Sequence, residues 1–365
     1  MSVVEQVEQG ALGVQLSEPS STFSSMAQAL RLSVSEIKRA RRLLHTKAAF
    51  TWSLAAISYV VLVISSLGFV LKAVAAVLLT HALVAIATGI MHDANHGSFS
   101  SKRRVNAFVA YSADLLGASS LLWRQQHNVL HHRHTNVEGV DGDIDQMPFA
   151  RLSASQPLHK FHRYQHVYMW FLYGFLTIRW FVVGDFVGAA QFKKNPQTSK
   201  AVTASGVLKM LLGKAVHASW ALVVPFLFSP WWCVLLTYMA ISYSVGFVLA
   251  VTFQVAHCVA EADFVSADPG VLKGNAMITH QLNTTVDVVP GNFLARAYVG
   301  YISGGLQFQV EHHIQPRTPH TAYPLLSAKV RALCSQHGLT YRTHNGVWSA
   351  VRAHARYLKL MGQPA

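Results

Sequence analysis

The chain has 365 residues, of which 52% are hydrophobic and 13% are charged, and its formal net charge is +14. Its three cysteines are too few and too scattered for a disulfide framework. A nucleic-acid-binding surface would explain the charge, but the basic residues flank apolar segments and no motif for nucleic acid accompanies them. We therefore expect no nucleic-acid partner and ask whether the apolar segments are long enough to cross a membrane.

Residues 1–47 are expected to form a disordered tail followed by a basic segment that precedes the membrane. The first 25 or so residues are rich in Ser, Gln and Glu. They lack the positively charged start and apolar centre of a signal peptide. Basic residues then accumulate between Arg31 and Lys47.

Residues 48–365 are expected to form one membrane domain. Residues 48–71 and 73–91 are uncharged and are separated only by Lys72, and each is about as long as the roughly 20-residue helix that spans a bilayer. Residues 215–260 are also uncharged and contain a Ser229-Pro230 turn signal, enough for two helices if Lys209 and Lys214 extend to the interface. The predicted spans are 48–71, 73–91, 207–229 and 232–257.

Four spans place both termini and the segments after the second and fourth spans on the same side of the membrane. The basic residues gather on that side, which the positive-inside rule makes cytoplasmic. Residues 105–123 and 167–187 are apolar, but Asp114, Arg179 and Asp185 interrupt them. We expect these two segments to lie at the membrane interface as part of a helical cytoplasmic cap.

Histidines form three clusters, at residues 92–96, 127–132 and 309–313, each beyond a long apolar segment. Residues four apart share one face of a helix, so the rings of each cluster can approach one metal region. His257 ends the fourth span, where an ionisable residue is a functional candidate. The alternative is that these are interfacial histidines serving solubility or hydrogen bonding. The expected ligands are His92, His96, His127, His131, His132, His257, His312 and His313, with the amide oxygen of Gln309 as a further candidate.

Eight imidazoles exceed the six positions around one metal ion and therefore predict two ions. The sequence has no cysteine cluster for iron–sulfur centres, and Met91 is the only methionine beside a histidine cluster, which disfavours copper. Asn128 follows His127 where a zinc protease needs a glutamate. Two iron ions with O2 as cosubstrate are the best remaining match. Such a pair can form an oxidant that takes hydrogen from an unactivated C–H bond.

Three segments carry a resemblance to a known family: residues 92–98 (HDANHGS), 123–136 (WRQQHNVLHHRHTN) and 304–316 (GGLQFQVEHHIQP). They resemble the three histidine boxes of integral-membrane fatty acid desaturases. Gln309 in the third box is similar to the front-end and bacterial linoleoyl-type branch. The similarity covers roughly residues 85–320.

The resemblance implies an all-α integral membrane fold, with four transmembrane helices and a cytoplasmic cap that holds a histidine-rich diiron site. It implies a fatty acyl substrate, carried on CoA, a carrier protein or a lipid, and a location in a bacterial inner membrane. The sequence has no His-Pro-Gly-Gly motif of a fused cytochrome b5, so we expect a separate ferredoxin or cytochrome-type electron donor. Candidates for shaping the substrate site, with cap packing as the alternative, are Trp123, Thr135, Asn136 and Asp141; His280 is expected beside the ligands rather than among them.

Two alternatives remain at this point. The family usually has Leu and then an apolar residue after the third-box histidines, whereas here Ile314 is followed by Gln315. An acyl hydroxylase or an alkyne-forming acetylenase on the same scaffold is therefore the close alternative. The more distant one is a non-enzymatic haem or metal membrane protein, although haem needs only two axial histidines and a transporter places its ligands near mid-membrane.

Overall fold

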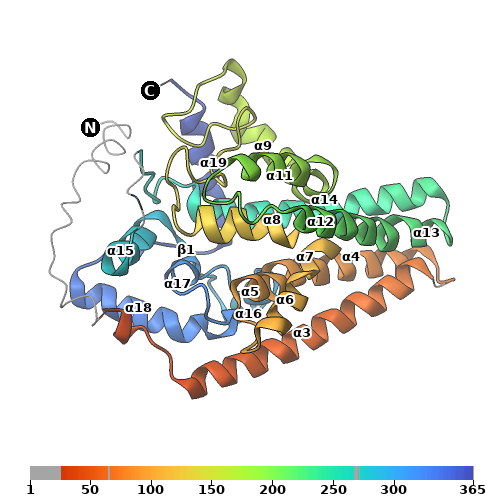
Figure 1. Cartoon of the computed structure of the whole chain (residues 1–365), viewed down its shortest axis with the longest axis horizontal. Coiled ribbons are helices and arrows are strands. Elements are labelled where there is room, and N and C mark those ends of the chain that lie inside the picture. Colours follow the sequence, from red (N-terminus) through yellow and green to blue (C-terminus); the bar gives the residue numbers. More distant parts are fainter. Residues whose placement is uncertain (1–25, 65, 267–269, 271, 365) are drawn as a thin grey trace.

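A computed structural model describes residues 26–64, 66–266, 270 and 272–364, so the tail expected at residues 1–25 lies outside the described part. The described chain has two regions (Figure 1): long helices extend together on one side, and shorter helices form a cap at their other end. This arrangement confirms the predicted all-α membrane architecture.

Within the described residues, four helices are long and apolar enough to cross a membrane. Two of them contain a short segment with a different helical winding. The first is α3 (Val34–Val63); the second comprises α4 (Phe69–Ala85), the π-helical η1 (Ile86–Met91) and α5 (His92–His96); the third comprises α12 (Ala204–Ala218), the π-helical η5 (Ser219–Val223) and α13 (Val224–Phe226); the fourth is α14 (Trp231–His257).

The first two helices differ from the predicted spans at their ends. α3 begins at Val34 instead of residue 48, because Ser33 and Glu36 form a capping box that starts a helix through the basic segment. The chain then turns ahead of Gly68, which caps the start of α4. Lys72 was expected to separate the two spans but lies in the first turn of α4. One lysine does not interrupt a helix, whereas glycine has a low helix propensity.

Two bent helix pairs occupy the interface between the long helices and the cap. The first pair bends by 113° and the second by 73°. Their elements are α6 (Arg103–Ala110), α7 (Ser112–Leu115), α8 (Ser120–Arg124) and the π-helical η2 (Gln125–His131), then η3 (Lys160–Tyr164), α9 (Gln165–Tyr173), α10 (Leu176–Arg179), the π-helical η4 (Trp180–Gly184) and α11 (Asp185–Lys194).

A buried ion pair joins the second bent pair to the third long helix. Lys214 was expected to extend to the interface, but its ammonium group lies 2.5 Å from Asp185. It also donates to the carbonyl oxygens of Gly117 at 2.6 Å and Trp180 at 2.7 Å. Lys214 therefore connects α12 to both bent pairs, because a buried ammonium needs acceptors within the protein.

The rest of the cap follows α14. Its two short strands, β1 and β2, pair in parallel, with Asp287 opposite Thr343. The elements are α15 (Gly274–Thr284), β1 (Asp287–Val288), α16 (Phe293–Ile302), α17 (Gln309–Ile314), η6 (His320–Ala322), α18 (Tyr323–His337), β2 (Thr343–His344) and α19 (Val347–Met361).

Candidate metal centre

Four segments bring imidazole rings into one buried cluster where the long helices meet the cap. α5 ends the second long helix, and His257 ends the fourth. η2 with the turn after it ends the first bent pair, and α17 carries the third histidine box. All the expected ligands are more than nine-tenths buried: His92, His96, His127, His131, His132, His257, Gln309, His312 and His313.

The rings form two groups with a histidine between them. In each group the ligand nitrogens all lie within 4.8 Å of one another. The first group is His92, His96, His127 and His312; the second is His131, His257 and His313. His132 forms a further group with His312 and His313, one from each set, and so lies between them. This arrangement offers two adjacent metal positions.

The imidazole nitrogens are arranged to bind cations and not to hydrogen-bond with one another. His92 Nε2 lies 3.3 Å from His127 Nε2, and His132 Nε2 lies 3.2 Å from the same atom. The Nε2 atoms of His96, His257 and His312 are buried without a hydrogen-bond partner in the described part of the chain. A buried nitrogen without a partner costs roughly 1–3 kcal/mol. A metal ion between these nitrogens would satisfy several of them at once.

The convergence also fixes how often the chain crosses the membrane. Composition and length alone would allow up to six crossings, if each bent pair were one span. However, His96 precedes the first bent pair and His127 is part of its end, and their nitrogens lie in one group. A segment that begins and ends at the same place makes no net crossing. The first bent pair therefore makes no net crossing, and the four long helices are the candidate spans.

A π-helical turn brings the second histidine cluster together. On an α-helix, adjacent residues point about 100° apart, so His131 and His132 could not both face the same centre as His127. In η2 the backbone N–H of His132 instead donates to the carbonyl of His127 at 2.9 Å. This i to i+5 bond places the rings of His127 and His132 4.6 Å apart. The spacing of the histidines gave no signal of this turn.

Asp141 orients His131 from behind. Its Oδ2 accepts the Nδ1–H of His131 and the backbone N–H of Asn136, both at 2.9 Å. Burial raises the pKa of Asp141, but the facing His131 outweighs burial and brings this pKa below its usual value. With its proton held on Nδ1, His131 presents a free Nε2 to a metal.

Thr135 and Gln281 support His313 in the same way. The Nδ1 of His313 lies 2.9 Å from Gln281 Oε1 and 3.2 Å from Thr135 Oγ1. Asn136 adopts a positive φ of 55° and donates from its amide to the carbonyl of His257 at 3.0 Å. Thr135 and Asn136 thus contact ligand residues. Gln281 was not among the residues expected at the site from the sequence.

His312 depends on a tyrosine that the sequence analysis missed. Its Nδ1 lies 3.0 Å from the hydroxyl of the fully buried Tyr323. A second chain of hydrogen bonds lies beside the first cluster: Lys47 donates to His320 Nε2 at 3.0 Å, and His320 Nδ1–H donates to Asp93 at 3.0 Å. Asp93 is next to His92 in the sequence. Tyr323 and Lys47 lie outside all three boxes, so only the fold could reveal them.

Trp123, Gln309 and His280 occupy three different positions around the cluster. Trp123 lies against the first group, with its ring centroid 4.3 Å from that of His127. Gln309 is buried at the start of α17 and lies near His257 of the second group. His280 is buried on α15, but its nitrogens belong to none of the possible ligand groups.

Burial keeps most of the cluster neutral. It is the main cause that lowers the pKa of His132, His312 and His313 well below the usual value, and neighbouring imidazoles lower it further. Burial also lowers the pKa of His131, but Asp141 outweighs burial there and brings this pKa above its usual value. Neutral imidazole is the form that binds metal ions. The electrostatics of the cluster therefore favour metal binding at neutral pH.

A buried carboxyl pair lies behind the third box. Asp287 Oδ1 accepts the backbone N–H of Val310 at 2.9 Å. Tyr341 contacts the carboxyl groups of both Asp287 and Glu311 through its hydroxyl. Burial raises the pKa of Asp287 to about 6 and that of Glu311 well above its usual value. These groups attach the start of α17 to β1 and to the segment before β2.

Gln315, the departure from the family pattern, is directed away from the metal centre. Its amide donates to the carbonyl oxygen of Leu30 at 3.1 Å and its Oε1 accepts from Thr318 at 3.2 Å. Both partners lie outside the histidine groups. Gln315 therefore attaches the residues before α3 to the cap, and its position gives no support to altered chemistry at the metal centre.

Together, a bundle of four long apolar helices and a buried set of imidazoles define a membrane protein with a histidine-rich metal centre. Residues 67–345 match the family model for fatty acid desaturase. The chain belongs to the fatty acid desaturase family and is an oxidoreductase of that family.

Its relatives include lipid desaturases from a moss and from cyanobacteria. The chain is 34% identical to the acyl-lipid (8-3)-desaturase of Physcomitrium patens over 76% of its own length and 58% of the relative's. It is 32% identical to the sn-1 linoleoyl-lipid 6-desaturase of Arthrospira platensis, over 80% and 78% of the two chains. It is 27% identical to the enzyme of the same name from Synechocystis, over 81% of this chain and 82% of the relative.

Proposed function

We propose that this protein is a diiron, O2-dependent desaturase that converts two neighbouring methylenes of a lipid-linked acyl chain into a double bond. One observation carries the proposal: two groups of buried imidazoles share one cluster, with His132 between them. When bound, two irons supply the reduction of O2 and the removal of hydrogen from an unactivated C–H bond.

The two ligand groups would hold one iron each. His92, His96, His127 and His312 would hold the first iron, and His131, His257 and His313 the second. His132 would serve the position between them, and Gln309 would complete the second site directly or through a water molecule.

The protein supplies orientation and shielding. Asp141 and Gln281 hold ligand rings by their Nδ1 atoms, as does Tyr323, and these contacts fix which nitrogen is free for metal. Trp123 covers the first group, and burial excludes water from the cluster. Neighbouring methylenes are chemically alike, so the position in which the chain is held determines which pair reacts.

The relatives support a lipid-linked substrate over a CoA or carrier-protein thioester, because they are named as desaturases of acyl lipids and linoleoyl lipids. The net charge of +14 suits an acidic ferredoxin or cytochrome-type electron donor. By the positive-inside rule, the basic residues in the first part of α3 support a cytoplasmic location of the histidine side. The cyanobacterial relatives support a bacterial inner membrane.

The test measures metal and product together. The purified protein is analysed for iron, then supplied with ferredoxin, reductant, O2 and a panel of linoleoyl lipids and acyl thioesters. We expect near two irons per chain and a product that has lost two hydrogens. His131→Ala should abolish both results, whereas His337→Ala, at an exposed position on α18, should change neither.

Three outcomes would contradict the proposal in different ways. A product that gains one oxygen would make the protein a hydroxylase. Zinc in place of iron would overturn the diiron assignment. Turnover of thioesters but not of lipids would overturn the substrate assignment alone.

A further inference from the structure

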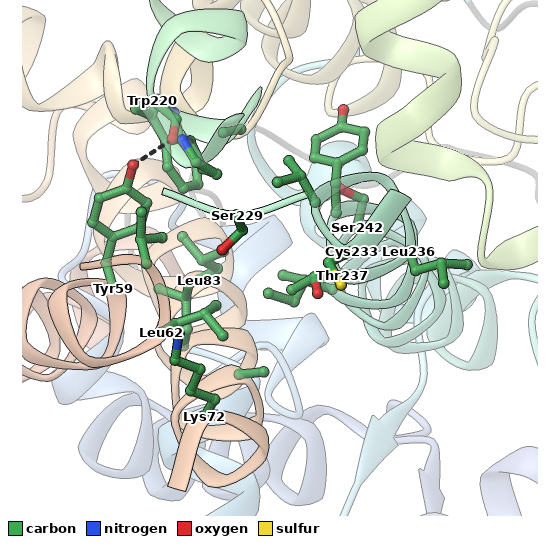
Figure 2. A pocket seen from close by; sticks show the side chains of 18 of the residues that line it. Tyr59, Leu62, Lys72, Leu83, Trp220, Ser229, Cys233, Leu236, Thr237 and Ser242 are labelled. Carbon is green, nitrogen blue, oxygen red and sulfur yellow. Dashed lines mark hydrogen bonds between the residues drawn. The ribbon is translucent and has the colours of Figure 1, made fainter. Parts of the chain in front are cut away.

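The long helices border a partly open cavity of about 570 Å3 toward the end opposite the histidine cluster. It lies between α3 and α4 on one side and α14 on the other, with residues of η5 and α13 closing the wall (Figure 2). Leu116 and Thr177 of the two bent pairs and His217 of α12 also line it. Val63 near the end of α3, Phe69 at the start of α4 and Trp232 at the start of α14 line its outer part. The cavity therefore begins at the membrane surface far from the metal centre.

The cavity is long enough for one acyl chain. Its lining residues on α14 run from Trp232 to Val245, which corresponds to about 20 Å at the helical rise of 1.5 Å per residue. Half of a typical hydrocarbon core is about 15 Å thick. The cavity thus extends from the far surface to beyond the middle of the bilayer.

Several polar side chains in its wall are already bonded within the protein. Tyr59 donates to the carbonyl of Trp220 at 2.6 Å, and Thr177 donates to the carbonyl of Ser242 at 2.8 Å. His217 bonds the hydroxyl of Tyr238 at 3.1 Å. The remaining lining is mostly aliphatic and aromatic. Such a wall suits a hydrocarbon chain better than a polar ligand.

The outer part of the cavity combines a positive charge with interfacial aromatic residues. Lys72 is the only lysine, arginine or acidic residue among the described residues that line the cavity. It extends along the wall toward Leu62 (Figure 2). Trp231 and Trp232, 67% and 53% exposed, stand at the start of α14 and mark the membrane interface. An anionic headgroup at this surface would lie within reach of the lysine.

A packed layer separates the cavity from the metal centre. The innermost lining residue on α4 and η1 is Leu83, nine positions or about 14 Å before His92. Ile86, Ala87 and Ile90 lie between them and are at most 2% exposed. A substrate chain held at the histidines would have to pass this layer to enter the cavity.

We propose that this cavity binds one acyl chain of an anionic phospholipid from the leaflet opposite the histidine cluster, with its phosphate near Lys72. This lipid is distinct from the substrate. It would fill the space between α3 and α4 on one side and α14 on the other. The binding requires neither iron nor turnover.

The test uses the full-length protein in detergent, stripped of lipid and titrated with dioleoyl phosphatidylglycerol or dioleoyl phosphatidylcholine under native mass spectrometry. Ala76→Phe fills the cavity, because Ala76 lines it. Val77→Phe is the matched control, because Val77 is the next residue, is 55% exposed and does not line the cavity. Lys72→Gln removes the charge. Thermal unfolding confirms that each variant is folded.

We expect one tightly retained phosphatidylglycerol on the wild type and on Val77→Phe, and none on Ala76→Phe. Lys72→Gln should bind phosphatidylglycerol about five-fold more weakly, the effect of one lysine at a membrane surface, and phosphatidylcholine unchanged. Equal retention by the two phenylalanine variants would overturn the site, and unchanged selectivity in Lys72→Gln would overturn the headgroup assignment. If Ala76→Phe retains the lipid but shortens the acyl chains it desaturates, the cavity belongs to the substrate.

Discussion

The Nδ1 of His131 and the Oδ2 of Asp141 are 2.9 Å apart, and neither side chain is exposed to solvent. Asp141 also accepts the backbone N–H groups of Asn136 and Asp143. The carboxylate is therefore fixed before any metal binds, and it fixes the His131 ring in turn. The histidine clusters provide the ligands, but residues between and beyond the clusters determine where those ligands point.

Replacing Asp141 should weaken the second metal position. In Asp141→Asn a neutral amide replaces the carboxylate that accepts the Nδ1–H of His131. The ring of His131 is then held less firmly, and its Nε2 becomes less basic. Loss of such a partner typically costs 10–100-fold in metal affinity or activity. We expect iron to fall toward one per chain and turnover to fall by that factor, measured by metal analysis with a chelator titration. Asp145→Asn, at an exposed position, should behave as wild type, and an unchanged chelator titration for Asp141→Asn would contradict the assignment.

Tyr323→Phe should weaken the first metal position instead. The substitution keeps the buried ring but leaves His312 Nδ1 without its partner 3.0 Å away, a loss of about 1–3 kcal/mol. We expect roughly ten-fold weaker iron retention with a near-native melting temperature. Tyr168→Phe is the control, because the Tyr168 hydroxyl donates to the carbonyl oxygen of Phe149, which belongs to none of the histidine groups. Equal iron affinity in the two variants would mean that Tyr323 does not orient His312.

Gly304→Ala should displace the third box. Gly304 has a φ of +58°, and a Cβ there would lie 2.3 Å from the backbone carbon of Thr88. Neither backbone can yield without moving η1 or the segment before α17, so we expect a loss of about 3 kcal/mol or more. The thermal unfolding temperature and the iron content of the variant report this loss. Gly291→Ala, where a Cβ meets nothing within 4 Å, should be nearly neutral; a comparable effect at both positions would refute the explanation.

Relative to the Asp287→Asn variant, the wild type should be more stable in acid than at neutral pH. The folded pKa of Asp287, about 6, lies above the ordinary value of 3.8, so the folded state holds this proton more tightly. The resulting stability is fully present below pH 4 and is lost as the pH rises through 6. Asp287→Asn does not titrate. The stability of the wild type relative to the variant should therefore fall by up to roughly 3 kcal/mol between pH 4 and 7, and a pH-independent difference in thermal unfolding would contradict this.

The sequence allowed the membrane architecture to be predicted because segment length and the absence of charge suffice to identify a span. It indicated the histidine clusters for a similar reason, since imidazoles repeated beyond each span are a local signal. The helix start at Val34 was missed although Ser33 and Glu36 are a local capping-box signal. The buried contacts of Lys214 could not be predicted, because they depend on a partner 29 residues away. Tyr323 was missed because its contact with His312 depends on the folding of the cap.

The π-helical winding of η2 has a consequence for the length of the second histidine box. One residue removed from Gln125–His131 would allow ordinary α-helical winding and rotate the preceding side chains by about 100°. His127 would then leave the first group, although every histidine remained in the sequence. The number of residues in this box therefore determines the ring positions as much as their identity does. Insertions or deletions there should be far less tolerated than conservative substitutions between the histidines.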